Sequence, residues 1–102
     1  MRAHALPEYY QTTQTEYVQF LKSRGYSNDE IGKHAGLSDT SLMLALDPKL
    51  VRLAQLPSAA KPTAEQGVVG DPRRSSAELG QPGIDAVVSK TVAAVKKAVE
   101  HH

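Results

Sequence analysis

His34 and Asp39 lie five residues apart in the segment HAGLSDTSLMLAL, and both are residue types that can take part in proton transfer. Histidine is the side chain that most readily exchanges a proton near neutral pH. A nearby carboxylate can hold one tautomer of the ring or stabilise its charged form. Gly36 lies between them and allows a ligand to approach the backbone closely. This segment is therefore one candidate for an acid–base site, with His34 and Asp39 as the candidate residues.

The same two residues also fit an ordinary structural role. His34 is expected at the end of one helix and Asp39 at the start of the next. A cation is mildly favoured at the first of these places and an anion at the second. Because single His/Asp pairs are common in structural networks, their spacing alone leaves both interpretations open.

The elements expected around this pair are helices. The first is expected over residues 7–24, because apolar side chains recur there at helical spacing. Gly25 fits the left-handed residue that follows a helix, and Tyr26 is placed to pack back onto it.

Residues 27–51 contain the His34/Asp39 motif. Ser27 and Glu30 form a capping-box pattern that predicts the start of a short helix. Ser38 is expected to cap a second, strongly apolar helix over residues 40–46. These helices would place the motif at the junction between them.

The second half of the chain is predicted to be a loop followed by a helical segment. Residues 57–70 are rich in Pro, Ala, Ser, Lys and Gly and predict a surface loop, with a brief extended stretch at Val68–Val69. Residues 71–100 form the C-terminal helical segment, with an expected interruption at Pro82–Gly83. One apolar stripe continues to its end: Ile84, Val88, Val92, Val95 and Val99.

Length and composition set broad limits. At 102 residues the chain is one domain at most, and its net charge of +1 gives no global indication of a nucleic-acid or membrane partner. It has no cysteine, which excludes disulfides and thiolate metal ligands. The opening MRAHALPEYY has no apolar core typical of a signal peptide, so a cytoplasmic location is expected. His101 and His102 are interpreted as tag residues.

The chain resembles the C-terminal half of creatininase (creatinine amidohydrolase) family proteins over roughly residues 9–99. In that family a His-(Ala/Gly)-Gly segment is followed by an acidic residue, Thr and Ser, and by an apolar helix that ends before a proline. The matching residues here are His34, Ala35, Gly36, Asp39, Thr40, Ser41 and Pro48. A second similar segment comprises Gly70, Asp71, Pro72, Ala77, Glu78 and Gly80.

The resemblance implies a fold and roles for individual residues. The implied fold is α/β, a three-layer α/β/α sandwich, of which residues 1–102 would form a partial and mostly α-helical domain. His34 would be the acid–base residue and Asp39 its supporting carboxylate, although the family more often has Glu at the second position. Residues implied to lie near the substrate are Gly36, Thr40 and Ser41.

The resemblance also implies metals and partners that this chain does not supply. Family members bind two divalent ions, commonly zinc or manganese, through Glu-x-His-Gly and Gly-His or His-Gly-Gly-Asn segments, and this sequence contains neither. We therefore expect part of a metal-dependent hydrolase of an amide C–N bond, with no metal ligand in this chain and no activity alone. The expected partners are a complementary N-terminal half or further copies of the chain, and a small amide substrate.

Two other functional classes remain open. Residues 26–46 are also compatible with a helix-turn-helix that binds DNA. Residues 39–46, its recognition helix, have no Lys, Arg, Asn or Gln, the side chains that usually contact phosphates and bases. The third interpretation is a non-catalytic module in which the helix over residues 84–99 packs onto a partner.

Overall fold

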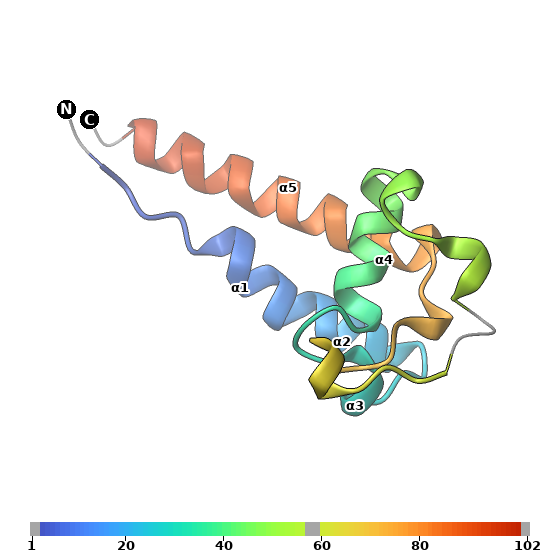
Figure 1. Cartoon of the computed structure of the whole chain (residues 1–102). Coiled ribbons are helices and arrows are strands. Elements are labelled where there is room, and N and C mark those ends of the chain that lie inside the picture. Colours follow the sequence, from blue (N-terminus) through green and yellow to red (C-terminus); the bar gives the residue numbers. More distant parts are fainter. Residues whose placement is uncertain (1–2, 57–59, 101–102) are drawn as a thin grey trace.

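The computed structural model describes residues 3–56 and 60–100, and this part of the chain is mostly helical (Figure 1). The α-helices are α1 (Glu8–Gln14), α2 (Glu16–Ser23), α3 (Asn28–Ile31), α4 (Leu37–Leu46) and α5 (Ala77–Glu100). Short 3₁₀ turns are η1 (Pro48–Leu50), η2 (Leu53–Gln55), η3 (Ala64–Gln66) and η4 (Pro72–Arg74). No helix in these described ranges is long and apolar enough to span a membrane. The histidines interpreted as a tag lie outside them.

The expectation of a mostly α-helical chain is confirmed. Within the described residues the only β pairing is an isolated antiparallel bridge between His34 and Val69. The sheet of a three-layer α/β/α sandwich is therefore not formed by this part of the chain and remains an expectation from the family. The bridge does confirm the brief extended stretch expected at Val68–Val69.

The helix expected over residues 7–24 is divided in two at Thr15. This residue has φ -119° and ψ -80°, outside the helical region. Its hydroxyl donates a hydrogen bond to the Gln11 carbonyl at 2.8 Å, and the Thr12 hydroxyl does the same to Glu8 at 2.6 Å. Side-chain hydroxyls that bond to carbonyls of the preceding turn often bend helices. The cluster of threonines therefore accounts for the break.

The hydrophobic core lies where α2, α3 and α4 meet. Its buried apolar residues are Tyr17, Leu21, Ile31, Leu37 and Leu44. After α2, Gly25 has φ +94° and the Tyr26 N–H donates to the Leu21 carbonyl at 3.2 Å. The left-handed stop predicted at this glycine is confirmed. It turns the chain so that α3 packs against the end of α2.

Two helix starts differ in detail from the sequence expectation. The Ser27 hydroxyl accepts from the Glu30 N–H at 3.2 Å, so the predicted serine cap of α3 is confirmed, but the Glu30 side chain does not reach back to complete the predicted capping box. The second helix begins at Leu37, with Gly36 in the capping position, so the prediction of Ser38 as its cap is wrong. Ser38 instead donates to the Ile31 carbonyl at 3.3 Å, because its hydroxyl faces the end of α3.

Helix α5 crosses α4 at a pair of glycines and continues unbroken through Pro82–Gly83. A Cβ atom on Gly80 would collide with the Ser41 carbonyl oxygen, and one on Gly83 would lie 2.8 Å from the Tyr17 ring. The expected interruption is wrong, because Pro82 lies in the second turn, where it removes one backbone hydrogen bond, and the close α4–α5 packing fixes the helix on both sides of it. Because α4 begins shortly after His34, its packing on α5 also joins α5 to the segment around His34.

Candidate active site

The backbone of His34 is held by a segment far along the chain. The Val69 N–H donates to the His34 carbonyl at 2.8 Å, and the Val69 carbonyl accepts from His34 at 3.2 Å and from Lys33 at 2.7 Å. The His34 side chain is exposed, and among the described residues its imidazole has no hydrogen-bond partner. The imidazole is therefore available to a ligand while its backbone is fixed.

Three glycines make this backbone pairing possible. A Cβ atom on Gly70 would lie 2.8 Å from the Cα atoms of both Gly32 and Gly36. A Cβ atom on Gly36 would lie 2.6 Å from the Ile31 carbonyl oxygen. These distances are too short for real carbon contacts, so side chains are excluded at the crossing. Gly36 is buried here, and its role in the structure is to let the two chain segments meet beside His34.

Ala35, directly after His34, has an unusual backbone conformation. Its φ is +54°, in the left-handed region that costs most side-chain-bearing residues about 1–2 kcal/mol. Asp39 Oδ2 accepts from the Ala35 N–H at 2.9 Å, and the Thr40 hydroxyl donates to the Ala35 carbonyl at 3.3 Å. The peptide groups on both sides of Ala35 are thus held by side chains of α4. Asp39 acts on the backbone next to His34 and makes no hydrogen bond with its ring.

The structure brings some of the expected site residues together and separates others. A hollow of about 230 Å³ is lined by His34, Ala35, Asp39, Thr40, Met43 and Val51. Ser41, expected near a substrate, is fully buried, and its hydroxyl accepts from the Ser76 N–H at 3.2 Å. Ser41 therefore connects α4 to the start of α5 and does not line this hollow.

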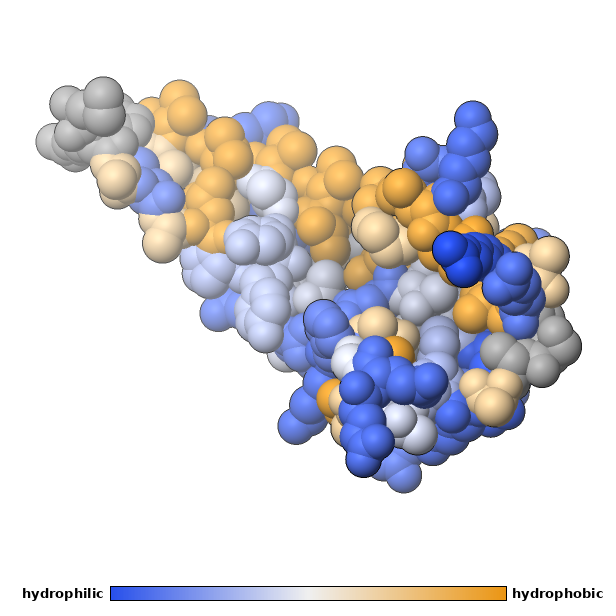
Figure 2. Space-filling model, viewed as in Figure 1, coloured by the Kyte–Doolittle hydropathy of each residue, from blue (hydrophilic) through white to orange (hydrophobic). Residues whose placement is uncertain are grey.

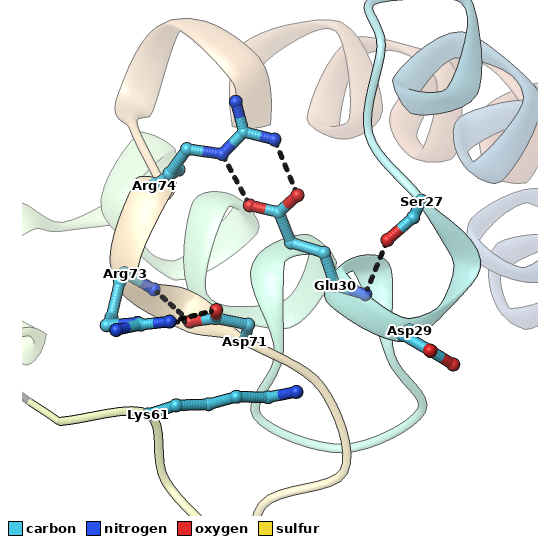
Figure 3. Close-up of a pocket in the computed structure, with 7 residues that line it drawn as sticks. All are labelled: Ser27, Asp29, Glu30, Lys61, Asp71, Arg73 and Arg74. Atoms are coloured by element: carbon cyan, nitrogen blue, oxygen red, sulfur yellow. Dashed lines mark hydrogen bonds and ion pairs between the residues drawn. The ribbon is translucent and has the colours of Figure 1, made fainter.

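A second hollow, of about 510 Å³, is strongly charged (Figure 3). Its lining residues are Ser27, Asp29, Glu30, Lys61, Asp71, Arg73 and Arg74. Both carboxylate oxygens of Glu30 accept from the Arg74 guanidinium at 2.6 Å, and this guanidinium lies 4.4 Å from the centre of the Tyr26 ring. Glu30 and Arg74 are 44 residues apart, so nothing in the local sequence pattern indicated this pairing.

The neighbouring pair, Asp71 and Arg73, stabilises the turn that follows Gly70. Arg73 donates to the Asp71 carboxylate through Nη2 at 2.8 Å, through Nε at 3.0 Å and through its backbone N–H at 3.1 Å. The Asp71 N–H donates to the Glu30 carbonyl at 2.9 Å. With both arginines already paired to carboxylates, the charged hollow fixes the Val69–Arg74 segment against α3 and so supports the His34–Val69 bridge.

Asp71 makes the stability of the folded state depend on pH in the acid range. The hydrogen bonds from Arg73 lower the pKa of the Asp71 carboxyl below the usual value of 3.8. A lowered pKa in the folded state stabilises the protein above the unfolded pKa, and this stabilisation is lost as pH falls through the folded value. We expect the urea concentration at half-unfolding to decrease when the pH is lowered below about 4. Asp71→Asn should remove part of this decrease. An identical pH profile for the variant and the parent would contradict this role.

The described residues do not form a metal site. They contain no group of three or more His, Cys, Asp or Glu side chains placed to hold an ion. A zinc site of the catalytic kind takes three protein ligands and keeps one open position. His34 and Asp39 supply two candidate side chains at most, and Asp39 is engaged with Ala35. Any metal that acts at this site therefore needs ligands from elsewhere.

The comparison with known proteins identifies the family. A family model described as creatinine amidohydrolase matches residues 2–95 of the chain. The chain belongs to the creatininase family. No curated protein and no solved structure matches it. At family level this creatininase-family chain is therefore a creatininase-like amidohydrolase, and the family is generally metal-dependent.

The outer surface of α4 bears on the helix-turn-helix interpretation. The large residues that α4 exposes include Met43 and Leu46, and Asp39 is also exposed. Phosphate contacts rely mainly on Lys and Arg, and α4 has neither. The hydroxyls of Ser38 and Thr40 already donate to backbone carbonyls of this chain. This surface favours burial against another layer of protein over contact with DNA.

Proposed function

We propose that this chain is the C-terminal portion of a creatininase-like enzyme that hydrolyses the C–N bond of a small amide in the cytoplasm, with His34 as its acid–base residue. The observation that carries the proposal is the conformation of Ala35, which is left-handed and held on both sides by α4. Strained residues of this kind cluster at functional sites, where the surrounding contacts maintain them. In this chain, the contacts of Asp39 and Thr40 with Ala35 also fix the backbone of the exposed His34.

In this proposal the site residues have different tasks. The His34 imidazole gives a proton to, or takes one from, the nitrogen that leaves when the amide is cleaved. Asp39 and Thr40 are positioning residues, because both contact the Ala35 backbone. The hollow of about 230 Å³ beside them is where the scissile group would lie. Gly36 allows the close backbone crossing with Gly70 beside His34, which lines this hollow.

The metals expected for the family, commonly zinc or manganese, find no ligand set among the described residues. We propose that their ligands belong to a complementary N-terminal half, either in the same longer protein or in a separate chain. The tasks given to His34, Asp39 and Thr40 concern proton transfer and backbone positioning, and they do not depend on where the ions lie.

This proposal is tested by metal removal and by separation of the two parts. The purified 102-residue chain, supplied with zinc or manganese, should show no hydrolysis of creatinine or of linear amides. The complex isolated from the source organism should be active, should lose its activity after chelation and should regain it when either ion is returned. Metal-stimulated turnover by the 102-residue chain alone would show that no complementary half is needed.

A further inference from the structure

The charged hollow beside α3 adjoins a further hollow of about 560 Å³. Asp29 and Lys61 line both hollows and therefore lie at their boundary. Neither hollow shares a lining residue with the hollow of about 230 Å³ at His34. Figure 2 shows hydrophilic residues gathered around α3, whereas apolar residues gather along α5. The boundary is thus a polar surface apart from the candidate active site.

Four charges of the charged hollow are bound to one another. Glu30 accepts from Arg74 through both carboxylate oxygens, and Asp71 accepts from Arg73 in the same way. The side chains of Glu30 and Asp71 are only 14% and 16% exposed. These two pairs are therefore fixed in place, and each is neutral as a whole.

Asp29 and Lys61 are the charged residues of this hollow that have no such partner. Within residues 3–56 and 60–100, the Asp29 carboxylate and the Lys61 ammonium form no hydrogen bond or ion pair, with each other or with another group. Both residues are exposed. Figure 3 shows Lys61 extended below the Asp71–Arg73 pair, with its ammonium directed toward the α3 side of the hollow. An uncommitted cation and an uncommitted anion thus border the same space.

We propose that Asp29 and Lys61 bind a small zwitterion of the amino-acid class at the boundary of the two hollows. The carboxylate of the ligand accepts from the Lys61 ammonium, and the ammonium of the ligand donates to the Asp29 carboxylate. Both hollows have volumes within the range of small-molecule sites, so an amino acid fits into either. This site lies apart from His34, and the proposal does not rest on the proposed function.

The charges at the boundary select a zwitterion over a simple ion. An anion without a positive group would be repelled by Asp29. A cation without a negative group would be repelled by Lys61 and by Lys33, an exposed residue that lines the second hollow. Like-charge contacts of this kind are a common source of specificity. A ligand that carries both charges avoids both repulsions.

A bound ligand would also hold two distant segments together. Asp29 belongs to α3, whereas Lys61 precedes the segment that crosses α3 at Gly70. Val69 and Gly70 line the second hollow, so the ligand would lie beside this crossing. Because only the folded chain brings Asp29 and Lys61 together, the ligand should raise the temperature of thermal unfolding.

An NMR titration of the ¹⁵N-labelled 102-residue chain with L-alanine tests the proposal. We expect saturable shifts of the Asp29, Lys61 and Gly70 amide signals at millimolar concentrations, because exposed ion pairs are weak. N-acetyl-L-alanine keeps only the negative charge and L-alaninamide only the positive one, and each should bind about threefold more weakly or worse. Equal affinity for N-acetyl-L-alanine would indicate a plain anion site, and equal affinity for L-alaninamide a plain cation site. Either result, or the absence of saturable shifts, would overturn the proposal.

Two variants assign each end of the ligand to its residue. Lys61→Gln should weaken L-alanine binding about threefold or more and remove its advantage over L-alaninamide. Asp29→Asn should weaken binding by a similar factor and remove the advantage over N-acetyl-L-alanine. Lys22→Gln is the matched control, because Lys22 is exposed on α2 and lines neither hollow, and it should leave binding unchanged.

Circular dichroism should show that all three variants fold, since the replaced side chains are exposed. Parental affinity for L-alanine in Lys61→Gln or in Asp29→Asn, or an equal loss in Lys22→Gln, would overturn the proposal. None of these measurements involves amide hydrolysis. Their outcome is therefore independent of whether His34 proves to be the acid–base residue.

Discussion

Replacing His34 by alanine should lower turnover of the complete enzyme by roughly 10²–10⁴-fold, the usual contribution of one general acid–base group. Complex formation and metal content should stay unchanged, because the imidazole contacts none of the described residues through a hydrogen bond. His34 is held through its backbone, and alanine preserves both hydrogen bonds to Val69. The measurement is kcat for amide hydrolysis, together with the bound metal determined by mass spectrometry.

Two further variants make this experiment specific. His4→Ala removes a histidine that lies before α1 and should leave kcat within about twofold, since exposed substitutions away from a site have small effects. Asp39→Ala should give an intermediate loss, and its pH profile should change because the orientation of His34 is no longer fixed through Ala35. Near-normal turnover of His34→Ala would remove this histidine from the mechanism.

Replacing Gly80 by alanine should destabilise the folded chain by about 3 kcal/mol or more, at the upper end of what overpacking costs. The added Cβ would collide with the Ser41 carbonyl oxygen, which is backbone and has little freedom to move. An isolated helix would respond in the opposite direction, since alanine is favoured over glycine by about 1 kcal/mol. The sign of the change in unfolding free energy therefore reports the α4–α5 crossing directly.

Urea unfolding followed by circular dichroism would measure this change. Ser89→Ala is the matched control, because Ser89 is exposed on the same helix and its replacement should alter stability by no more than about 0.5 kcal/mol. A Gly80→Ala variant as stable as the parent, or more stable, would show that the two helices do not cross closely. The loss of this crossing would also separate Ser41 from Ser76.

The sequence was most informative where a structural feature depends on neighbouring residues. The glycine stop after α2 and the Ser27 cap each involve contacts within a few positions. Contacts between residues so close in the chain can be recognised from a short sequence pattern. The break at Thr15 was missed because threonine hydroxyls can bond either to water or to the preceding turn, and the pattern of apolar residues does not distinguish these.

The contacts that define the site are of longer range. The His34–Val69 bridge and the Glu30–Arg74 pair join segments far apart in the chain, so no local pattern could indicate them. The left-handed conformation of Ala35 was also not predictable, because that region is usually occupied by glycine or asparagine. The sequence correctly indicated that His34 and Asp39 lie close together. It did not indicate that Asp39 would bond to the backbone of Ala35.

Native mass spectrometry of the untagged protein purified from its source organism would show whether this chain acts together with a metal-binding half. We predict one complex that contains this chain, the complementary metal-binding half and about two divalent ions. A metal-free assembly made only of the 102-residue chain would contradict this prediction, because His34 would then have no metal centre beside it.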